Sequence, residues 1–306
     1  MAKMHIERSI SINAPSKNVY KVISDFNDWR PWSPWLLMEP EAKVTVAEDA
    51  RSYKWEGNRT GSGNMKITQE VENEFIDYDL NFLKPWKSFA KTNFALSQEG
   101  NATKVTWTMD SSLPFFMFFM KGMMEAFVGA DYERGLDMLK AYVEEGEVPS
   151  SIDFTGNKEF EGVPWIGIKT SCSLDEVGPK MEADFTKLRQ VAEDKGISEF
   201  MMLSIYHKWD IPKGRVIYTA AMGVKELPSD LPADVITCHI PKSDCYVLKH
   251  TGRYQHLGNA WSTLYTMMRN KEIKHNKKID PFEIYLNDPK ETPEKELVTE
   301  IYFPVK

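Results

Sequence analysis

Apolar and polar residues alternate at the start of the chain, where polar side chains separate Ile6, Ile10 and Ile12. This period of two predicts a β-strand with one buried face. The sequence NAPS at residues 13–16 is typical of a helix start, and the apolar positions within residues 19–26 predict a short helix. Strand-like runs separated by turn residues then follow at residues 42–46, 53–57, 63–71, 74–83, 88–97 and 103–109.

A helical period appears in the most apolar part of the chain, LPFFMFFMKGMMEAFVG at residues 113–129. Its uninterrupted apolar run ends at Lys121, far short of the roughly 20 residues that span a bilayer, so we expect no membrane insertion. Apolar residues from Met117 to Val143 recur at steps of three and four, which predicts a long amphipathic helix over residues 116–145. The element order predicts an α+β fold, in which a curved antiparallel sheet grips the long C-terminal helix.

The first turns of this helix carry more apolar side chains than a single buried stripe requires. A cavity, a neighbouring domain or a dimer partner would each cover them. The methionines also suit a soft metal, although methionine at helical spacing more often fills a core. We expect an apolar cavity between helix and sheet. Its candidate lining residues are Phe116, Met120, Met124, Phe127 and Trp86.

Three segments of this half resemble one superfamily. They are INAPSKNVYKVISDFNDWRPWSPW from Ile12, WEGNRTGSGNMKI from Trp55 and FVGADYERGLDMLKAYVEEG from Phe127. Together they are similar to the SRPBCC helix-grip domains, which include START-like lipid carriers and polyketide cyclase-like proteins, over about residues 3–146. The resemblance implies a deep apolar pocket under the long helix. It leaves the activity open, because carriers, sensors and enzymes share this fold.

A segment rich in Gly, Pro and Ser follows the long helix and breaks its period. Such a composition predicts an interdomain linker. We therefore expect a first domain at residues 1–148, a linker at 149–157 and a second domain at 158–306.

The second half repeats its own apolar pattern at an offset of 79 residues. The offset aligns Ile168 with Val247, and the pair at residues 205–206 with the pair at residues 284–285. Each repeat predicts a strand, a helix and two further strands. Two such βαββ units related by a pseudo-two-fold axis would form a groove between their helices and sheets.

The residues of the second repeat again resemble a known family. GRYQHLGNAWSTLYTMM at residues 252–268 and FEIYLNDPKETPEKELVTEIYFPV at residues 282–305 are similar to the GyrI-like domain. This domain is named for a DNA gyrase inhibitor and is also the effector-binding domain of certain multidrug-responsive transcription regulators. The resemblance covers about residues 157–306 and implies that the groove binds a small molecule.

The last strand places one charged residue among apolar ones. Thr299, Ile301 and Phe303 point to one side of the strand, so Glu300 and Tyr302 point to the other. If the first set packs on the helices, we expect Glu300 to lie in the groove, and the family resemblance points to the same glutamate. A solvated glutamate on an edge strand is the alternative.

A carboxylate among aromatic rings suits a cationic or electron-poor planar ligand. If the protein is an enzyme, Glu300 and Tyr302 are the candidate catalytic pair. The candidate ligand-binding residues are Glu300, Tyr302, Tyr206, Tyr254, Trp261 and Tyr285.

Composition and charge narrow the function classes. The 306 residues carry a net charge of −7 without a basic patch, which argues against direct nucleic-acid binding. Cys172, Cys238 and Cys245 do not form a disulfide framework, and no HExxH or zinc-finger spacing occurs, so we expect neither a metal nor another cofactor. The start MAKMHIERSI lacks a signal peptide, which favours a cytoplasmic location.

Three functions remain. The first is a binding protein with a cavity in each domain and no DNA-binding module, acting as a sensor, carrier or sequestering protein for hydrophobic, aromatic or cationic molecules. The second is an enzyme, either a GyrI-like hydrolase of strained-ring electrophiles with Glu300 as base or a cyclase. The third is a gyrase-directed or other protein-interaction module. We favour the first. The sequence leaves the oligomeric state open, and a homodimer is one option.

Overall fold

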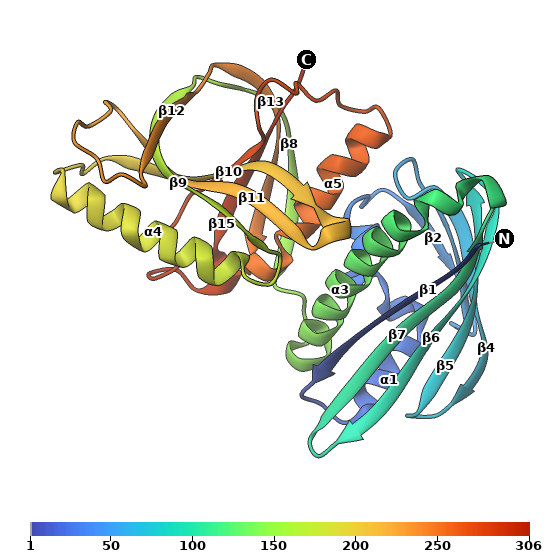
Figure 1. Ribbon diagram of the computed structural model, residues 1–306. Coiled ribbons are helices and arrows are strands. Elements are labelled where there is room, and N and C mark those ends of the chain that lie inside the picture. Colours follow the sequence, from blue (N-terminus) through green and yellow to red (C-terminus); the bar gives the residue numbers. More distant parts are fainter. Residues whose placement is uncertain (1) are drawn as a thin grey trace. The chain divides into compact units, whose positions relative to one another are not determined.

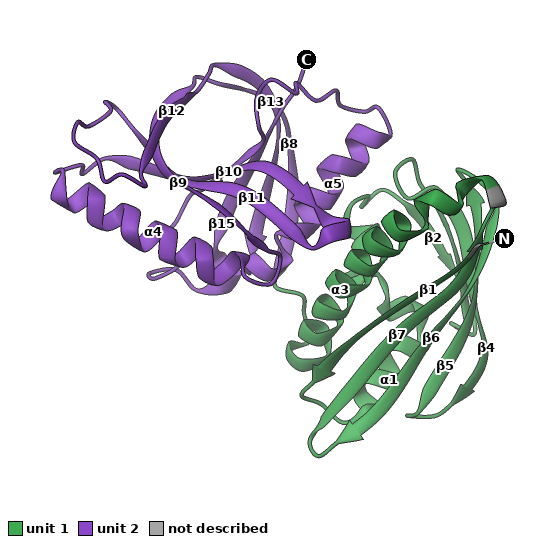
Figure 2. Ribbon diagram, viewed as in Figure 1, with its two compact units in different colours: residues 1–149 green, residues 150–306 purple. Residues whose placement is uncertain are grey.

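The computed structural model describes residues 2–306, and the chain divides into two compact units, residues 1–149 and 150–306 (Figure 2). Each unit contains one antiparallel sheet, and the units are described separately below. A long helix follows the first sheet. These features confirm the predicted α+β fold class.

Unit 1 contains a seven-stranded antiparallel sheet in the order β1-β7-β6-β5-β4-β3-β2, in which β2 to β7 form a meander and β1 pairs with β7 at one edge (Figure 1). The predicted strand runs agree closely with those observed. The strands are β1 (Ala2–Ile12), β2 (Lys43–Val46), β3 (Ser52–Glu56), β4 (Ser62–Val71), β5 (Phe75–Lys84), β6 (Ser88–Glu99) and β7 (Ala102–Leu113). The helices are α1 (Ser16–Ser24), α2 (Pro34–Leu37) and α3 (Lys121–Glu145).

The predicted helix at residues 116–145 has two parts. Phe115–Met120 form the 3-10 helix η3, and α3 follows and ends before Gly146, whose φ of +81° suits a residue without a side chain. The C-terminal half of α3 packs on the sheet through buried Leu136 and Leu139. The burial of this face, rather than the apolar start of the helix, attaches α3 to unit 1.

Unit 2 contains an eight-stranded sheet in the order β12-β9-β11-β10-β14-β15-β13-β8. Two helices, α4 (Val177–Asp194) and α5 (Gly258–Arg269), pack on this sheet (Figure 1). The strands are β8 (Ser150–Phe160), β9 (Val163–Ser173), β10 (Phe200–Asp210), β11 (Arg215–Val224), β12 (Ile236–Ile240), β13 (Ser243–Gly252), β14 (Phe282–Tyr285) and β15 (Val298–Pro304).

The sheet order of unit 2 reproduces the repeat seen in the sequence. The first repeat is β9-α4-β10-β11 and the second is β13-α5-β14-β15, so both have the predicted βαββ order. In the sheet, β9-β11-β10 is followed by β14-β15-β13, which is the mirror order of equivalent strands. The centre of the sheet therefore lies where β10 pairs with β14, and equivalent residues of the two repeats meet there.

The predicted linker at residues 149–157 is corrected by the structure. Residues 150–160 form β8, which pairs with β13 from Ser150↔Gly252 to Phe160↔Ser243. Ile152 and Phe154 alternate with polar residues in this Ser- and Gly-rich segment, and both pack against the core of unit 2. This is the pattern of a strand with one buried face. The pairing partner of β8 is distant in sequence, so the local composition carried no sign of the pairing and suggested a linker.

The two faces of the unit 2 sheet carry different cores. The face toward the helices combines Leu188 of α4 and Leu264 of α5 with Ile301 and Phe303 of β15. The opposite face buries its own apolar cluster, including Ile205, Phe282 and Tyr302. Any side chain on a central strand therefore lies either beneath the helices or in this second cluster.

A buried histidine predicts acid sensitivity of unit 2. His250 is fully buried on β13; its Nε2 lies 2.9 Å from Ser150 Oγ, and its Nδ1 has no hydrogen-bond partner among the described residues. Burial, with a smaller contribution from His256, lowers its pKa to about 4. Because the unfolded chain has the higher pKa, protonation favours unfolding, so stability should fall as pH drops from about 6.5 toward 4, by roughly 3 kcal/mol in total.

Hydrogen exchange of β13 peptides, measured across this pH range on the full chain, reports this loss. The variant His250→Asn cannot take up the proton and should show a flatter pH dependence than the parent protein. Equal slopes in the two proteins would contradict the assignment.

Candidate functional site

A buried carboxylate lies at the centre of the unit 2 sheet, on the face toward the helices. Glu283 of β14 is 1% exposed and pairs with Ile301 of β15. Its Oε2 accepts hydrogen bonds from the hydroxyls of Tyr206, at 3.0 Å, and Tyr285, at 2.6 Å. Its Oε1 accepts from the indole N–H of Trp261 at 2.5 Å. Three donors from β10, β14 and α5 thus converge on one carboxyl group.

Burial and hydrogen bonding act in opposite directions on this carboxyl group. Burial raises the pKa of Glu283, and the hydrogen bonds from Tyr285, Trp261 and Tyr206 offset only part of that effect, so its pKa lies above the usual value. Burial, together with the neighbouring Glu283, raises the pKa of both phenols well above the ordinary value. The phenols therefore remain protonated donors at neutral pH.

Aromatic rings surround the carboxyl group on two sides. Tyr206 stacks on Trp209 at a centroid distance of 4.9 Å and meets the edge of Trp261 at 5.0 Å. Tyr285 meets Phe185 of α4 at 5.6 Å and Tyr254 at 5.7 Å. These contacts surround a buried carboxyl group with apolar aromatic walls.

The site reaches the surface through the residues around Tyr285. Tyr254, in the 3-10 helix η5 (Tyr254–His256), is 37% exposed, while Tyr285 and Phe185 are partly exposed. The indole N–H of Trp209 is buried without a hydrogen-bond partner among the described residues. Tyr254 is therefore the most exposed of these rings, and the indole N–H of Trp209 is a donor that no described residue uses.

The structure brings together four of the six predicted ligand-binding residues. Tyr206, Trp261 and Tyr285 contact Glu283 directly, and Tyr254 contacts Tyr285. Tyr254 is connected to Glu283 only through Tyr285, so it is the outermost member of the group. Glu283 itself was not predicted.

Glu300 and Tyr302 lie on the opposite face of the sheet, which corrects their expected position in the groove. In the register of β14 with β15, Glu300 pairs with Ile284 and Tyr302 pairs with Phe282, while Glu283 pairs with Ile301. Paired residues point to the same side of a sheet, so Glu300 and Glu283 point in opposite directions. The alternation along β15 was predicted correctly, but Glu283 and the rings around it lie on the side of Ile301.

Glu300 has structural partners on its own face. Its carboxylate accepts a hydrogen bond from the hydroxyl of Tyr302 at 2.7 Å and pairs with Lys158 of β8 at 3.3 Å. The Tyr302 ring stacks on Phe282 with an interplanar angle of 4°. These contacts connect the edge strand β8 to the centre of the sheet.

The predicted lining residues of unit 1 are unequally exposed. Phe116 is 73% exposed, Trp86 53% and Phe127 41%, so they form surface rather than the wall of a closed cavity. Met120 and Met124 are partly buried, and Met124 packs against the core. The apolar excess noted in the sequence thus lies largely at the surface.

Stacked aromatic rings fill the space between the sheet and the middle of α3. Trp107 of β7 stacks on Tyr132 of α3 at a centroid distance of 3.9 Å and on Phe94 of β6 at 4.7 Å. A Cβ at Gly135 would lie 2.9 Å from the Trp107 ring, so glycine at this position allows the helix to approach the ring. This part of unit 1 is solid core.

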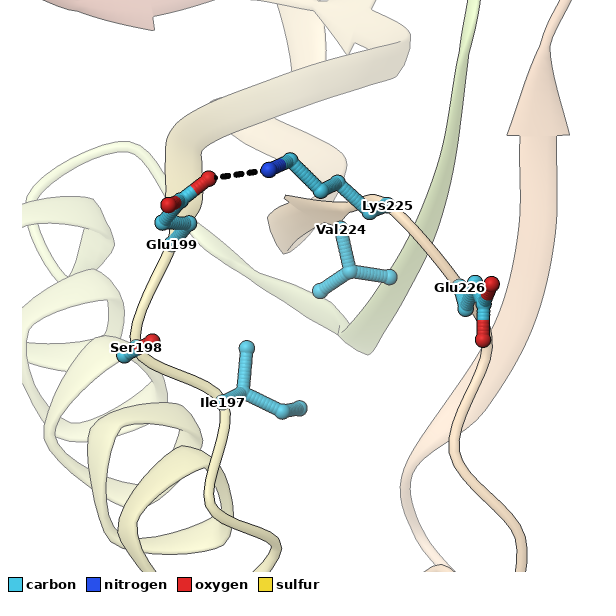
Figure 3. A pocket seen from close by; sticks show the side chains of 6 residues that line it. All are labelled: Ile197, Ser198, Glu199, Val224, Lys225 and Glu226. Carbon is cyan, nitrogen blue, oxygen red and sulfur yellow. Dashed lines mark ion pairs between the residues drawn. The ribbon is translucent and has the colours of Figure 1, made fainter.

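A surface hollow of about 270 Å³ lies in unit 2, and Figure 3 shows the residues that line it. Glu199 and Lys225 pair on its rim, with Ile197 and Val224 beneath. It contains none of the residues around Glu283. Within residues 2–306, no three His, Cys, Asp or Glu side chains are arranged to hold a metal ion, and no helix is long and apolar enough to cross a membrane.

The sequence contained a signal for Glu283. Residues two apart on a strand share a face, so the predicted groove position of Tyr285 places Glu283 in the same groove. The 79-residue offset aligns Glu283 with Ser204, and the two are cross-strand partners at the centre of the sheet. The hydroxyl of Tyr285 also lies 2.9 Å from Ser204 Oγ.

Two protein families match the chain, one in each of the two units. Residues 3–144 match the family described as polyketide cyclase / dehydrase and lipid transport. Residues 158–306 match the GyrI-like small molecule binding domain. No curated protein matches the chain.

Solved structures of low identity resemble each part. The C-terminal domain of EcmrR is 17% identical, with coverage of 51% of this chain and 98% of its own and a TM-score of 0.39. EcmrR in its DNA complex is 16% identical, with coverage of 60% of this chain, 65% of that chain and a TM-score of 0.44. A START superfamily protein from Mycobacterium smegmatis is 18% identical, with coverage of 46% of this chain and 97% of its own and a TM-score of 0.34. The chain thus joins an SRPBCC domain of the polyketide cyclase and lipid transport family to a GyrI-like small-molecule-binding domain.

Proposed function

We propose that the chain is a small-molecule sensor or carrier whose unit 2 binds a cationic or electron-poor aromatic ligand at Glu283. The observation that carries the proposal is the buried carboxyl group, which is surrounded by Tyr206, Tyr285 and Trp261. The membership of both halves in small-molecule-binding families supports it.

The chemistry of the site favours a cation of delocalised charge. Oε1 and Oε2 of Glu283 already accept three hydrogen bonds, so the carboxyl group has little remaining capacity for donors of a ligand. A planar cation instead gains from the nearby negative charge and from the faces of the rings. The unused N–H of Trp209 would orient a ligand that also carries an acceptor.

A second function has one specific observation in its favour. The pKa of Glu283 is raised by burial, and a carboxyl group with a raised pKa beside phenolic donors suits general base catalysis. In a hydrolase of strained-ring electrophiles, water would attack a ring carbon while the bond from that carbon to the ring heteroatom breaks. Glu283 would take the proton from water, and Tyr285, released from Glu283, would give its proton to the heteroatom. The proton on Glu283 would then return to Tyr285. This replaces the role that the sequence suggested for Glu300 and Tyr302.

For unit 1 we propose a separate apolar ligand near the start of α3. Met120, Met124, Phe116, Phe127 and Trp86 remain its candidate contacts. Because three of these side chains are exposed, such a ligand would bind at the end of the sheet and helix, away from the aromatic core around Trp107.

The pH dependence of binding tests the proposal for Glu283. N-methylquinolinium carries a permanent charge, so its affinity reports the ionisation of the protein. Because the pKa of Glu283 lies above 4.5, affinity should rise as pH increases from that value through the raised pKa, and then level off. The neutral isostere 1-methylnaphthalene should show no such rise. Calorimetry with both compounds measures this, and parallel pH profiles would rule out Glu283 as the charge that the ligand meets.

A further inference from the structure

Large apolar side chains are exposed at one end of unit 1. Two segments meet there, residues 83–89 at the β5–β6 turn and residues 113–124 after β7, and we call this surface the apolar tip. Strand pairing brings them together, since Ala90 of β6 pairs with Ser111 of β7 and the Ser111 hydroxyl donates to the carbonyl of Phe89. Six side chains of the tip are 47–73% exposed, namely Leu83, Trp86, Phe89, Phe116, Phe118 and Phe119.

The charge of the apolar tip differs from that of the chain. Its two segments contain Lys84, Lys87 and Lys121 and no acidic residue, and exposed Lys3 of β1 pairs with Ser112 beside them. Two acidic side chains approach from outside, each 3.6 Å from a lysine of the tip. Four lysines against two glutamates give this surface a local charge of +2, in a chain whose net charge is −7.

We propose that the apolar tip docks on the surface of an anionic lipid bilayer. Exposed Phe, Trp and Leu side chains beside lysines are the combination that lies at the boundary between lipid headgroups and acyl chains. Docking at this depth needs no spanning helix and differs from the insertion that the sequence argued against. A second copy of the chain is a less suitable occupant, because two tips of the same positive charge would face each other.

Vesicle co-sedimentation of the full chain tests the docking. The protein should sediment with mixed phosphatidylcholine–phosphatidylglycerol vesicles at low ionic strength, much less with phosphatidylcholine alone, and less as salt is raised. The variant Phe116→Ser/Phe119→Ser should weaken binding by roughly tenfold or more for each phenylalanine. Lys84→Gln/Lys87→Gln should weaken it by about fivefold for each lysine.

Matched variants on unit 2 control for general changes in surface character. Leu227→Ser/Ile236→Ser removes two side chains that are also 47% and 41% exposed, and Lys169→Gln/Lys213→Gln removes two exposed lysines. Both should bind vesicles like the parent protein. Because all four changes are at exposed side chains, folding should be retained, and circular dichroism checks it.

Two results would overturn the docking. One is no binding to anionic vesicles at low salt, or binding that Phe116→Ser/Phe119→Ser leaves unchanged. The other is light scattering that shows a dimer in the parent protein and a monomer in this variant, without vesicle binding, which would make the tip a contact between copies. Neither result affects the ligand site at Glu283, because that site is measured with soluble ligands.

Discussion

Glu283→Gln should weaken the binding of N-methylquinolinium by about 10- to 100-fold and leave 1-methylnaphthalene almost unaffected. The substitution removes the negative charge and keeps nearly the same shape, and a charged interaction in a buried site contributes about 1.5–3 kcal/mol. Unfolding stability should change little or rise slightly, since a buried charge is also removed. Calorimetric titration and urea unfolding of the same protein measure both quantities.

Glu300→Gln is the matched control for this experiment. It makes the same substitution on the opposite face of the same sheet, where the carboxylate contacts Lys158 and Tyr302. Cation affinity should remain that of the parent protein. If Glu300→Gln weakens the cation and Glu283→Gln does not, the ligand site lies on the face opposite the helices. In a hydrolase, Glu283→Gln would instead preserve substrate binding and abolish turnover, because an amide cannot accept the proton.

Glu39→Ala should destabilise unit 1 by about 3 kcal/mol. Glu39 is 5% exposed, and its carboxylate accepts hydrogen bonds from the backbone N–H groups of Asn58, Arg59 and Thr60 and from the Thr60 hydroxyl. Alanine leaves all four donors of this β3–β4 loop without their acceptor, which is costly for partly buried groups. Burial alone would raise the pKa of Glu39, but these hydrogen bonds outweigh it and leave the pKa below its usual value.

The neighbouring Glu41 provides the control, because it is exposed and close in sequence. Glu41→Ala removes the same charge and should change stability by less than about 0.5 kcal/mol. Urea unfolding followed by tryptophan fluorescence, with hydrogen exchange of peptides covering residues 57–61, measures the difference. Equal stability of the two variants would show that the carboxylate does not hold the loop. Because the pKa of Glu39 is lowered in the folded protein, its contribution to stability is complete above about pH 4.5 and is lost in more acidic solution.

The fold could be predicted largely because local periodicity determined it. Alternation predicted the strands of unit 1, and the 79-residue offset predicted the βαββ order of unit 2. The Glu39 contacts could not be predicted, because they join residues 19–21 positions apart through a loop conformation without a periodic signature. The strand β8 was missed for a related reason, since its partner β13 lies far along the chain.

The site was predicted in part. Tyr206, Trp261 and Tyr285 were named as rings around a carboxylate, and the structure brings these three together at Glu283. Ile301 packs on the helices, as expected, but the ligand-facing charge was expected on the opposite face of β15. Alternation fixes only which residues share a face. That the aromatic residues gather around a carboxyl group on the face of Ile301 comes from tertiary packing, where Glu283 pairs with Ile301.

The pairing of β10 with β14 shows where the two repeats differ at the site. Tyr206 and Tyr285 occupy equivalent positions of the two repeats, whereas the equivalent of Glu283 is Ser204, its direct partner across β10 and β14. Two identical repeats would have placed either two serines or two glutamates side by side at this point, and buried like charges at such a distance cannot both ionise. Divergence at this one position leaves the unit with a single carboxyl group at its centre. At the proposed site a ligand would then meet two halves whose phenols are alike and whose central residues differ, so we expect it to bind in one orientation.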